Sequence, residues 1–187
     1  MDTQTITSIA MGIALSACCG FRVFIPMLGA SVAAYAHWFS LPADMSWMGS
    51  LPALICFGTA AVLEIAAYYI PFVDNLLDTI ATPLAAVAGT VLAASFLPVG
   101  DVSPMLKWIL AIIAGGGAAA TVQTGTGLLR LASTKTTAGA GNQFVATGEN
   151  ALAVSGTVLS FVAPVVIAVI FLLLIGWIIR KLIKKLL

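Results

Sequence analysis

Four ionisable side chains inside apolar stretches are the candidates for chemistry in this chain: Arg22, Glu64, Asp78 and Arg130. Arg22 lies near the middle of the first apolar stretch, and Glu64 lies slightly past the middle of the second. A charge at the centre of a bilayer costs about 2.5–3.5 kcal/mol on an insertion scale. Such groups therefore usually face the interior of a helix bundle, where they pair or mark the path of an ion or substrate.

Glu64 has two candidate partners, Arg22 and Arg130. Antiparallel neighbouring helices would bring Arg22 and Glu64 together, either as an ion pair that pins two helices or as a binding or proton-relay site. Asp74 and Asp78 are four residues apart, on one face of a helical first turn. Asp74 then caps the helix while Asp78 interacts with its dipole. Alternatively, Glu64, Asp74 and Asp78 form an acidic mouth for a cation.

Other kinds of chemistry find little support. The single histidine, His37, lies in an aromatic interfacial linker, and no serine or cysteine has an evident base. Cys18, Cys19 and Cys56 have no nearby ligands in a metal-binding pattern. The glycines at 115–117 are not followed by the lysine of a phosphate-binding loop. We therefore expect no enzyme and no cofactor, and the sequence leaves metal binding undecided.

The composition is that of a membrane protein. The chain has 187 residues, of which 61% are hydrophobic and only 8% charged, with a mean hydropathy of +1.11. A soluble domain has about 25% charged residues. Apolar runs long enough to cross a hydrocarbon core of about 30 Å recur along the chain. We predict an all-α, polytopic transmembrane helix bundle that forms a single domain over residues 1–187.

Prolines and glycines divide the chain. Residues 6–35 are too long for one straight span, and Gly20 and Pro26 predict a kink or break around Arg22. Gly12, Ser16 and Gly20 form a small-residue stripe that allows another helix to approach. After a helix at 52–70, we predict a helix at 75–97 and a loop at 98–104. A further helix is predicted at 105–131, and a loop at 133–147. Ser103 and Pro104 are the expected cap and first residue of the helix at 105–131.

The C-terminal part, 144–187, is either one long helix or two helices that meet at Pro164. An internal repeat favours two, because residues 86–92 resemble residues 153–159 and a proline follows both copies. This two-helix repeat sets Glu64 opposite Arg130, and its copies share one membrane orientation. About six spanning helices are therefore expected, with five possible.

The charge distribution predicts an orientation. Four basic residues lie in the C-terminal tail, and Lys107 is alone on the opposite side if six helices cross the membrane. Cytoplasmic loops carry an excess of Lys and Arg. We therefore expect a multi-pass protein of the cell (plasma or inner) membrane with a cytoplasmic C-terminus. The net charge of +1 gives no reason to expect a nucleic-acid partner.

The chain contains several distinctive short motifs: Gly20-Phe21-Arg22 with Pro26, Glu64 with Ile70-Pro71 and Val73-Asp74, and Glu149-Asn150 before an apolar hairpin with a basic tail. Together they resemble a bacterial family of small integral membrane proteins, the domain-of-unknown-function 4126 family. Two positions differ from the family pattern: Tyr68-Tyr69 replaces a charged Asp-Lys pair, and Asn150 replaces one carboxylate. The resemblance implies the membrane architecture and no substrate.

Two functions are compatible with these patterns. The first is a small transporter- or permease-like protein for an ion or small solute, with Arg22, Glu64, Asp78 and Arg130 at the substrate site between two halves. The alternative is a structural or lipid-interacting scaffold without transport activity, supported by the small-residue stripe and the basic tail. Membrane lipid is an expected partner in both cases, and a homo-oligomer is plausible.

Overall fold

The computed structural model describes residues 2–97 and 103–186. Within these ranges the chain is all helical, with eight α-helices, one 3-10 helix, one π-helix and no strand. The sequence-based prediction of an all-α fold is therefore confirmed. Four helices are long and apolar enough to cross a membrane, or five if the bent pair formed by η1 (Ala43–Gly49) and α3 (Leu51–Ala67) counts as one span. The described residues thus support five spans at most, the lower number that the sequence left open.

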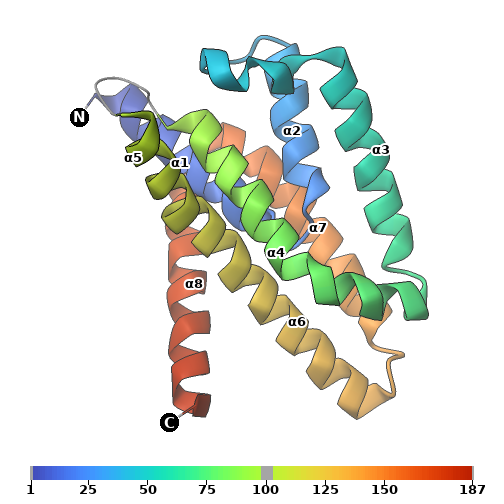
Figure 1. Cartoon of the computed structure of the whole chain (residues 1–187). Coiled ribbons are helices and arrows are strands. Elements are labelled where there is room, and N and C mark those ends of the chain that lie inside the picture. The colour runs from blue at the N-terminus through green and yellow to red at the C-terminus, as the bar shows by residue number, and fades with distance from the viewer. Residues whose placement is uncertain (1, 98–102, 187) are drawn as a thin grey trace.

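The number of spans is lower than the expected six because of the first apolar stretch. It forms two short helices, α1 (Thr3–Cys18) and α2 (Phe24–Tyr35), which are separated by a break at 19–23 as the glycine and proline predicted. At 1.5 Å per residue they are about 24 and 18 Å long, too short to cross a core of about 30 Å. In Figure 1, α1 runs down to the break and α2 returns upward, so the two short helices form a hairpin whose tip is the break.

The next two helices run in opposite directions, and α3 packs against α2 rather than against α4. Ser50 caps α3 by accepting a hydrogen bond from the Ala53 amide (3.3 Å), and Pro52 lies in the first turn as predicted. Helix α4 (Pro71–Phe96) begins at Pro71. The prediction that Asp74 caps this helix is therefore wrong, because Asp74 already lies within the first turn; its side chain is outside the described part.

The fourth apolar stretch is one 34-residue unit, Pro104–Thr137, made of α5 (Pro104–Leu110), the π-helix η2 (Ala111–Gly116) and α6 (Gly117–Thr137). Ser103 caps it, as predicted, by accepting a hydrogen bond from the Leu106 amide at 3.3 Å. The helix ends later than predicted, so much of the expected 133–147 loop is helical. Of the loop predicted at 98–104, residues 98–102 lie outside the described residues.

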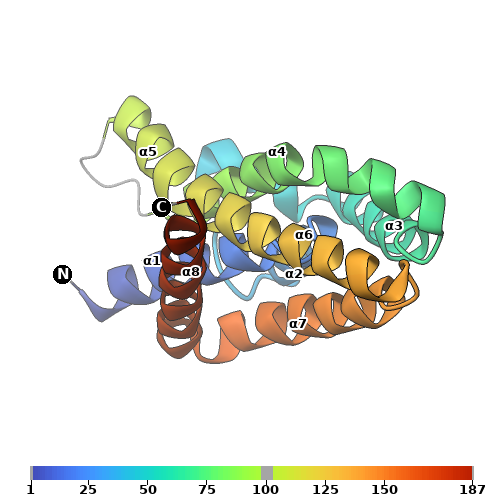
Figure 2. The same ribbon diagram turned by 90° about the horizontal axis from the view of Figure 1, so that it is seen from below.

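The C-terminal part consists of two helices, α7 (Asn142–Val162) and α8 (Pro164–Leu186), which meet at Pro164. The predicted break is confirmed. Figure 1 shows α3, α4, the α5–α6 unit, α7 and α8 running alternately down and up. Figure 2, seen from below, shows α8 in front of α1, on the side of the bundle away from α3. Only 17% of its most apolar window is buried, so most of its apolar surface faces outward.

Small residues bring the central helices together. A Cβ added to Gly89 on α4 would lie 2.6 Å from the Gly115 carbonyl oxygen, so these two backbones touch across the π-helix. The predicted stripe packs in the same way: on α1 the Ser16 hydroxyl donates to the Gly89 carbonyl (2.7 Å), and in the break after α1 Gly20 lies against Val122 of α6. The close packing fixes where α1 ends and therefore where Arg22 lies.

Candidate functional site

Arg22 lies in the break between α1 and α2 and is 1% exposed. Its Nε donates to Asn150 Oδ1 and one terminal nitrogen donates to Glu149 Oε2, both at 2.6 Å. The same nitrogen donates to the Phe21 carbonyl (2.8 Å), and the other donates to the Ala146 carbonyl (3.2 Å). The guanidinium therefore ties the tip of the hairpin to the first half of α7.

Arg130, on α6, is 2% exposed and faces the same carboxylate. Its Nε donates to Glu149 Oε1 at 3.1 Å, and a terminal nitrogen donates to Glu149 Oε2. The other terminal nitrogen donates to Asp78 Oδ1 of α4 at 3.3 Å. Because the two guanidiniums share Glu149, the carboxylate bridges the hairpin tip and α6.

The charged groups on three helices lie at a common depth. Asp78, Arg130 and Glu149 are each seven residues from the end of their helix on the side of the α3–α4 and α6–α7 turns. This spacing places each of them about 10 Å into the bundle. Figure 1 shows both turns at the same end, at the lower right. The polar cluster thus lies near one end of the bundle, with Asp78 as its most exposed carboxylate at 26% for the side chain.

Tyr68 fills the space beside the two arginines. Its ring centroid is 3.9 Å from the Arg22 Cζ and 4.1 Å from the Arg130 Cζ, and the residue is 5% exposed. Guanidinium groups bind well to aromatic faces when they are shielded from water. The neighbouring Tyr69 hydroxyl forms hydrogen bonds with Thr147 Oγ1 (3.0 Å) and Asn150 Nδ2 (3.3 Å). The tyrosine pair therefore packs on one side of the cluster.

Glu64 lies next to the cluster but has different partners. Its Oε1 accepts from the Val23 amide (2.8 Å) and its Oε2 from the Phe24 amide (3.0 Å). These amides belong to the first, otherwise unpaired positions of α2. The carboxylate also meets the positive end of the helix dipole there. Within the described residues no ion pair joins Glu64 to an arginine, so the candidate partnerships with Arg22 and Arg130 are replaced by a cap on α2.

The structure therefore brings Arg22, Asp78 and Arg130 into one network and places Glu64 at its edge. It adds Tyr68 and Glu149, which were not among the four candidate site residues. Glu149 had one recognisable signal, since it and Asn150 open the fifth predicted helix just as Asp74 and Asp78 open the third. Tyr68 had none, because an aromatic residue at a helix end resembles an ordinary interfacial anchor.

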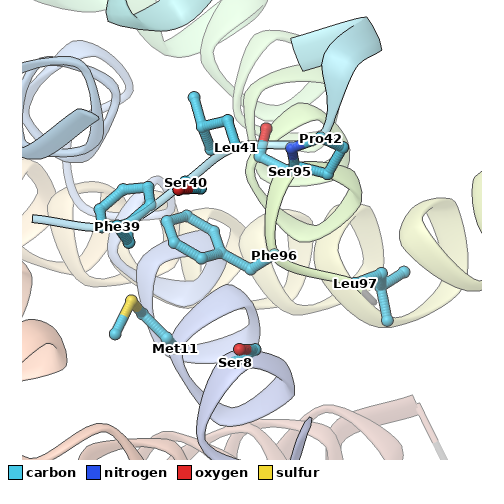
Figure 3. A pocket seen from close by; sticks show the side chains of 9 residues that line it. All are labelled: Ser8, Met11, Phe39, Ser40, Leu41, Pro42, Ser95, Phe96 and Leu97. Atoms are coloured by element: carbon cyan, nitrogen blue, oxygen red, sulfur yellow. The ribbon is translucent and has the colours of Figure 1, made fainter. Parts of the chain in front are cut away.

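The cluster is a network of ion pairs within a largely apolar bundle. Burying charges costs several kcal/mol per ion, and good geometry with further hydrogen bonds offsets that cost. Within the described chain, no three His, Cys, Asp or Glu side chains are grouped so that they could hold a metal ion. A cavity of about 320 Å³ lies elsewhere, at the other end of α4 (Figure 3), and none of the cluster residues lines it.

Comparison with known proteins identifies a family for the chain but no activity. Residues 9–184 match the model of a family described as "Domain of unknown function (DUF4126)". No curated protein and no solved structure matches the chain.

Proposed function

Because the chain belongs to the DUF4126 family, whose function is unknown, we propose a function from the geometry alone: a small transporter- or permease-like membrane protein for an ion or small solute. The observation that supports it is the convergence of Arg22, Asp78, Arg130 and Glu149 at the tip of a hairpin of two short apolar helices. Transporters commonly build their sites from such interrupted helices.

The energetics support a role beyond holding the helices together. Apolar residues of similar volume often replace a buried ion pair without loss of stability, so packing alone does not require four charges here. Asp78 is partly exposed and is linked through Arg130 to Glu149, which gives the network an opening towards the α3–α4 turn. An ion or polar solute would enter there by competing for Asp78 or Arg130. Catalysis is no part of the proposal.

The orientation follows from the distribution of charge. The C-terminal ends of α6 and α8 lie at the same end of the bundle as the cluster, and α5 lies at the other (Figure 1). The first two carry Lys135 and the basic residues Arg180, Lys181 and Lys184, and α5 carries Lys107. The positive-inside rule then places the C-terminus in the cytoplasm of a cell whose plasma or inner membrane holds the protein. With five spans and a re-entrant α1–α2 hairpin, the N-terminus lies outside.

The test is flux through proteoliposomes that contain the purified protein. Dye-reported movement of H⁺, Na⁺, K⁺ and Cl⁻, together with swelling in a panel of small neutral solutes, covers the ion and solute classes. Asp78→Asn and Glu64→Ala are expected to abolish a flux that Lys135→Gln leaves intact. A Glu64→Ala protein that is less stable but retains wild-type flux would assign Glu64 to structure alone.

The second candidate is a non-transporting scaffold that interacts with lipid, and one observation favours it. Most of the apolar window of α8 is unburied, and its basic end carries Lys181 packed over the Trp177 ring (4.9 Å). Basic residues next to a membrane span attract anionic lipid headgroups. Replacing Arg180, Lys181 and Lys184 by glutamine should then reduce co-purified anionic lipid, and absence of every flux in the panel would favour this candidate.

A further inference from the structure

The end of the bundle opposite the charged cluster contains a cavity of about 320 Å³. Its walls are Phe39–Pro42 of the linker after α2, Ser95–Leu97 at the end of α4, and Ser8 and Met11 of α1 (Figure 3). The distance along α4 from Asp78 to Phe96 is about 27 Å, so the cavity and the cluster are separate places. Nothing in the charged network accounts for the cavity.

The lining is polar but uncharged. Three serine hydroxyls, of Ser8, Ser40 and Ser95, meet apolar side chains, and none of the nine lining residues is ionisable. Ser95 Oγ donates to the Val91 carbonyl (2.8 Å) and lies 3.2 Å from the Met48 sulfur. Within the described part of the chain, the hydroxyls of the exposed Ser40 and the half-buried Ser8 have no partner in the protein. Ligand sites of this size combine apolar walls with a few polar groups that fix orientation. The chemistry fits a small uncharged molecule that has a hydroxyl or carbonyl group.

Residues 36–50, here called the strap, form one wall of the cavity. The far end of the strap is firmly held, since the Met48 carbonyl accepts from Ser31 Oγ (2.6 Å) and the Met48 side chain is fully buried. The part that lines the cavity is held by ring contacts, with the Phe39 centroid 4.9 Å from that of Phe96, and by Leu41, which packs against the core. Beside it, Asp44 Oδ2 accepts from Lys107 Nζ of α5 at 2.7 Å.

This ion pair is asymmetric. The Lys107 side chain is 4% exposed, whereas that of Asp44 is 52% exposed. Lys107 is therefore fixed in the body of the protein, and Asp44 is the surface group of the strap that attaches to it. The π-helix η2 follows α5 directly, and π-helical turns often occur at functional sites. The ion pair therefore joins an exposed group of the strap to a buried group of α5, and breaking it would release this part of the strap.

We propose that this half-open cavity is a binding site for a small uncharged solute and that the Asp44–Lys107 ion pair holds residues 39–44 as the wall that shields its inner end at Ser95. Opening moves residues 39–44 away from Phe96, while the Met48 end of the strap stays in place. The proposal rests on the cavity and the strap, and its test requires no transport activity.

The experiment measures the reactivity of a cysteine placed inside the cavity. Ser95 lines the cavity and is 2% exposed, so Ser95→Cys reports opening. The background is Cys56→Ser, because Cys56 is exposed; Cys18 and Cys19 are buried and report any general loosening. Ser46→Cys, on the exposed side of the strap, is the reference site. The probes are neutral methyl methanethiosulfonate and its trimethylammonium-ethyl and sulfonatoethyl analogues, each rate being divided by that of the same probe at Ser46→Cys.

Asp44→Asn and Lys107→Met are each expected to raise the normalised rate of the neutral probe at Ser95→Cys about fivefold or more. The charge-swapped protein, with Asp44→Lys and Lys107→Asp, should return towards the slow rate. The cationic and anionic probes should remain slow in all of them. An unchanged rate, a swap as reactive as the single variants, or simultaneous labelling of Cys18 and Cys19 overturns this role of the ion pair. Equal rates for charged and neutral probes overturn the uncharged solute class.

Discussion

Glu64 and Glu149 are two glutamates in the same part of the bundle, and the protein satisfies them in different ways. Glu149 lies between two guanidiniums, Arg22 and Arg130, and is 3% exposed. Glu64 accepts two backbone amides at the start of α2 and is less buried. One carboxylate is balanced by full charges, and the other by the amide dipoles of a helix end.

This difference indicates which structural elements each glutamate connects. Glu149 connects three elements, because its two arginines come from the α1–α2 break and from α6. Glu64 connects α3 to the tip of the hairpin alone. Removing Glu149 leaves two buried cations without their shared anion, while removing Glu64 leaves two amides that water can reach in part. The predictions below separate these two situations, in order of decreasing expected effect.

Glu149→Gln should be the most destabilising single change. A neutral amide takes the charged partner from Arg22 and leaves Arg130 paired with the partly exposed Asp78. Breaking a buried pair in this way costs about 3–5 kcal/mol. The measurement is thermal or denaturant unfolding in detergent micelles. Gln143→Ala, at an exposed position on the same helix, is the control and should change stability by less than about 0.5 kcal/mol. A Glu149→Gln protein as stable as this control would show that the ion pairs contribute little.

Arg22→Met should cost less, about 2–4 kcal/mol, because Glu149 keeps Arg130 as a partner. A double-mutant cycle sharpens the comparison. Arg22→Met and Glu149→Met are in contact and should show a coupling energy of about 1–3 kcal/mol, whereas Arg22→Met and Glu64→Gln should couple by less than about 0.5 kcal/mol. The reverse order of coupling would mean that Glu64 is the true partner of Arg22, as one reading of the sequence suggested.

The sequence predicted the elements better than the partnerships. The break around Arg22, the cap at Ser103, the junction at Pro164 and the small-residue stripe follow from local rules on proline, glycine and capping. Local rules could not show that the broken stretch turns back on itself, because direction after a break depends on packing against α3 and α4. The number of spans was overestimated for that reason.

The candidate site was recovered in part for a similar reason. The free-energy cost of burying a charge identified Arg22, Glu64 and Arg130 as residues that need partners. That cost does not indicate which of them contact each other. Two arginines and one glutamate in apolar stretches suggested pairing with Glu64. The sequence did not indicate the α2 backbone amides as partners of Glu64. Amides at the start of a helix lack an intrahelical acceptor, and the start of α2 is defined only by the exact position of the break.

Glu64→Gln should destabilise moderately, by about 1–2 kcal/mol. The amide oxygen accepts only one of the two amide hydrogens, and the favourable charge at the α2 N-terminus is lost. Glu64→Ala should cost more, because both amides lose their acceptor. Hydrogen exchange at Val23 and Phe24 is the direct measurement, and it should accelerate in both variants. Unchanged protection of these two amides in Glu64→Ala would contradict the capping role.

Asp78→Asn should have the smallest effect on stability, below about 1 kcal/mol, because the Asp78 side chain is partly exposed and Arg130 retains Glu149. The loss should shrink further at high salt, since screening acts on exposed pairs and much less on buried ones. Unfolding at low and high NaCl measures this, with Glu149→Gln as the variant whose defect should not depend on salt. If Asp78→Asn destabilised as strongly as Glu149→Gln, and equally at both salt concentrations, the mouth of the network would be as integral to the fold as its centre. The proposed entry of an ion at Asp78 would then lose its structural basis, because a group that the fold cannot release cannot exchange its partner for a substrate.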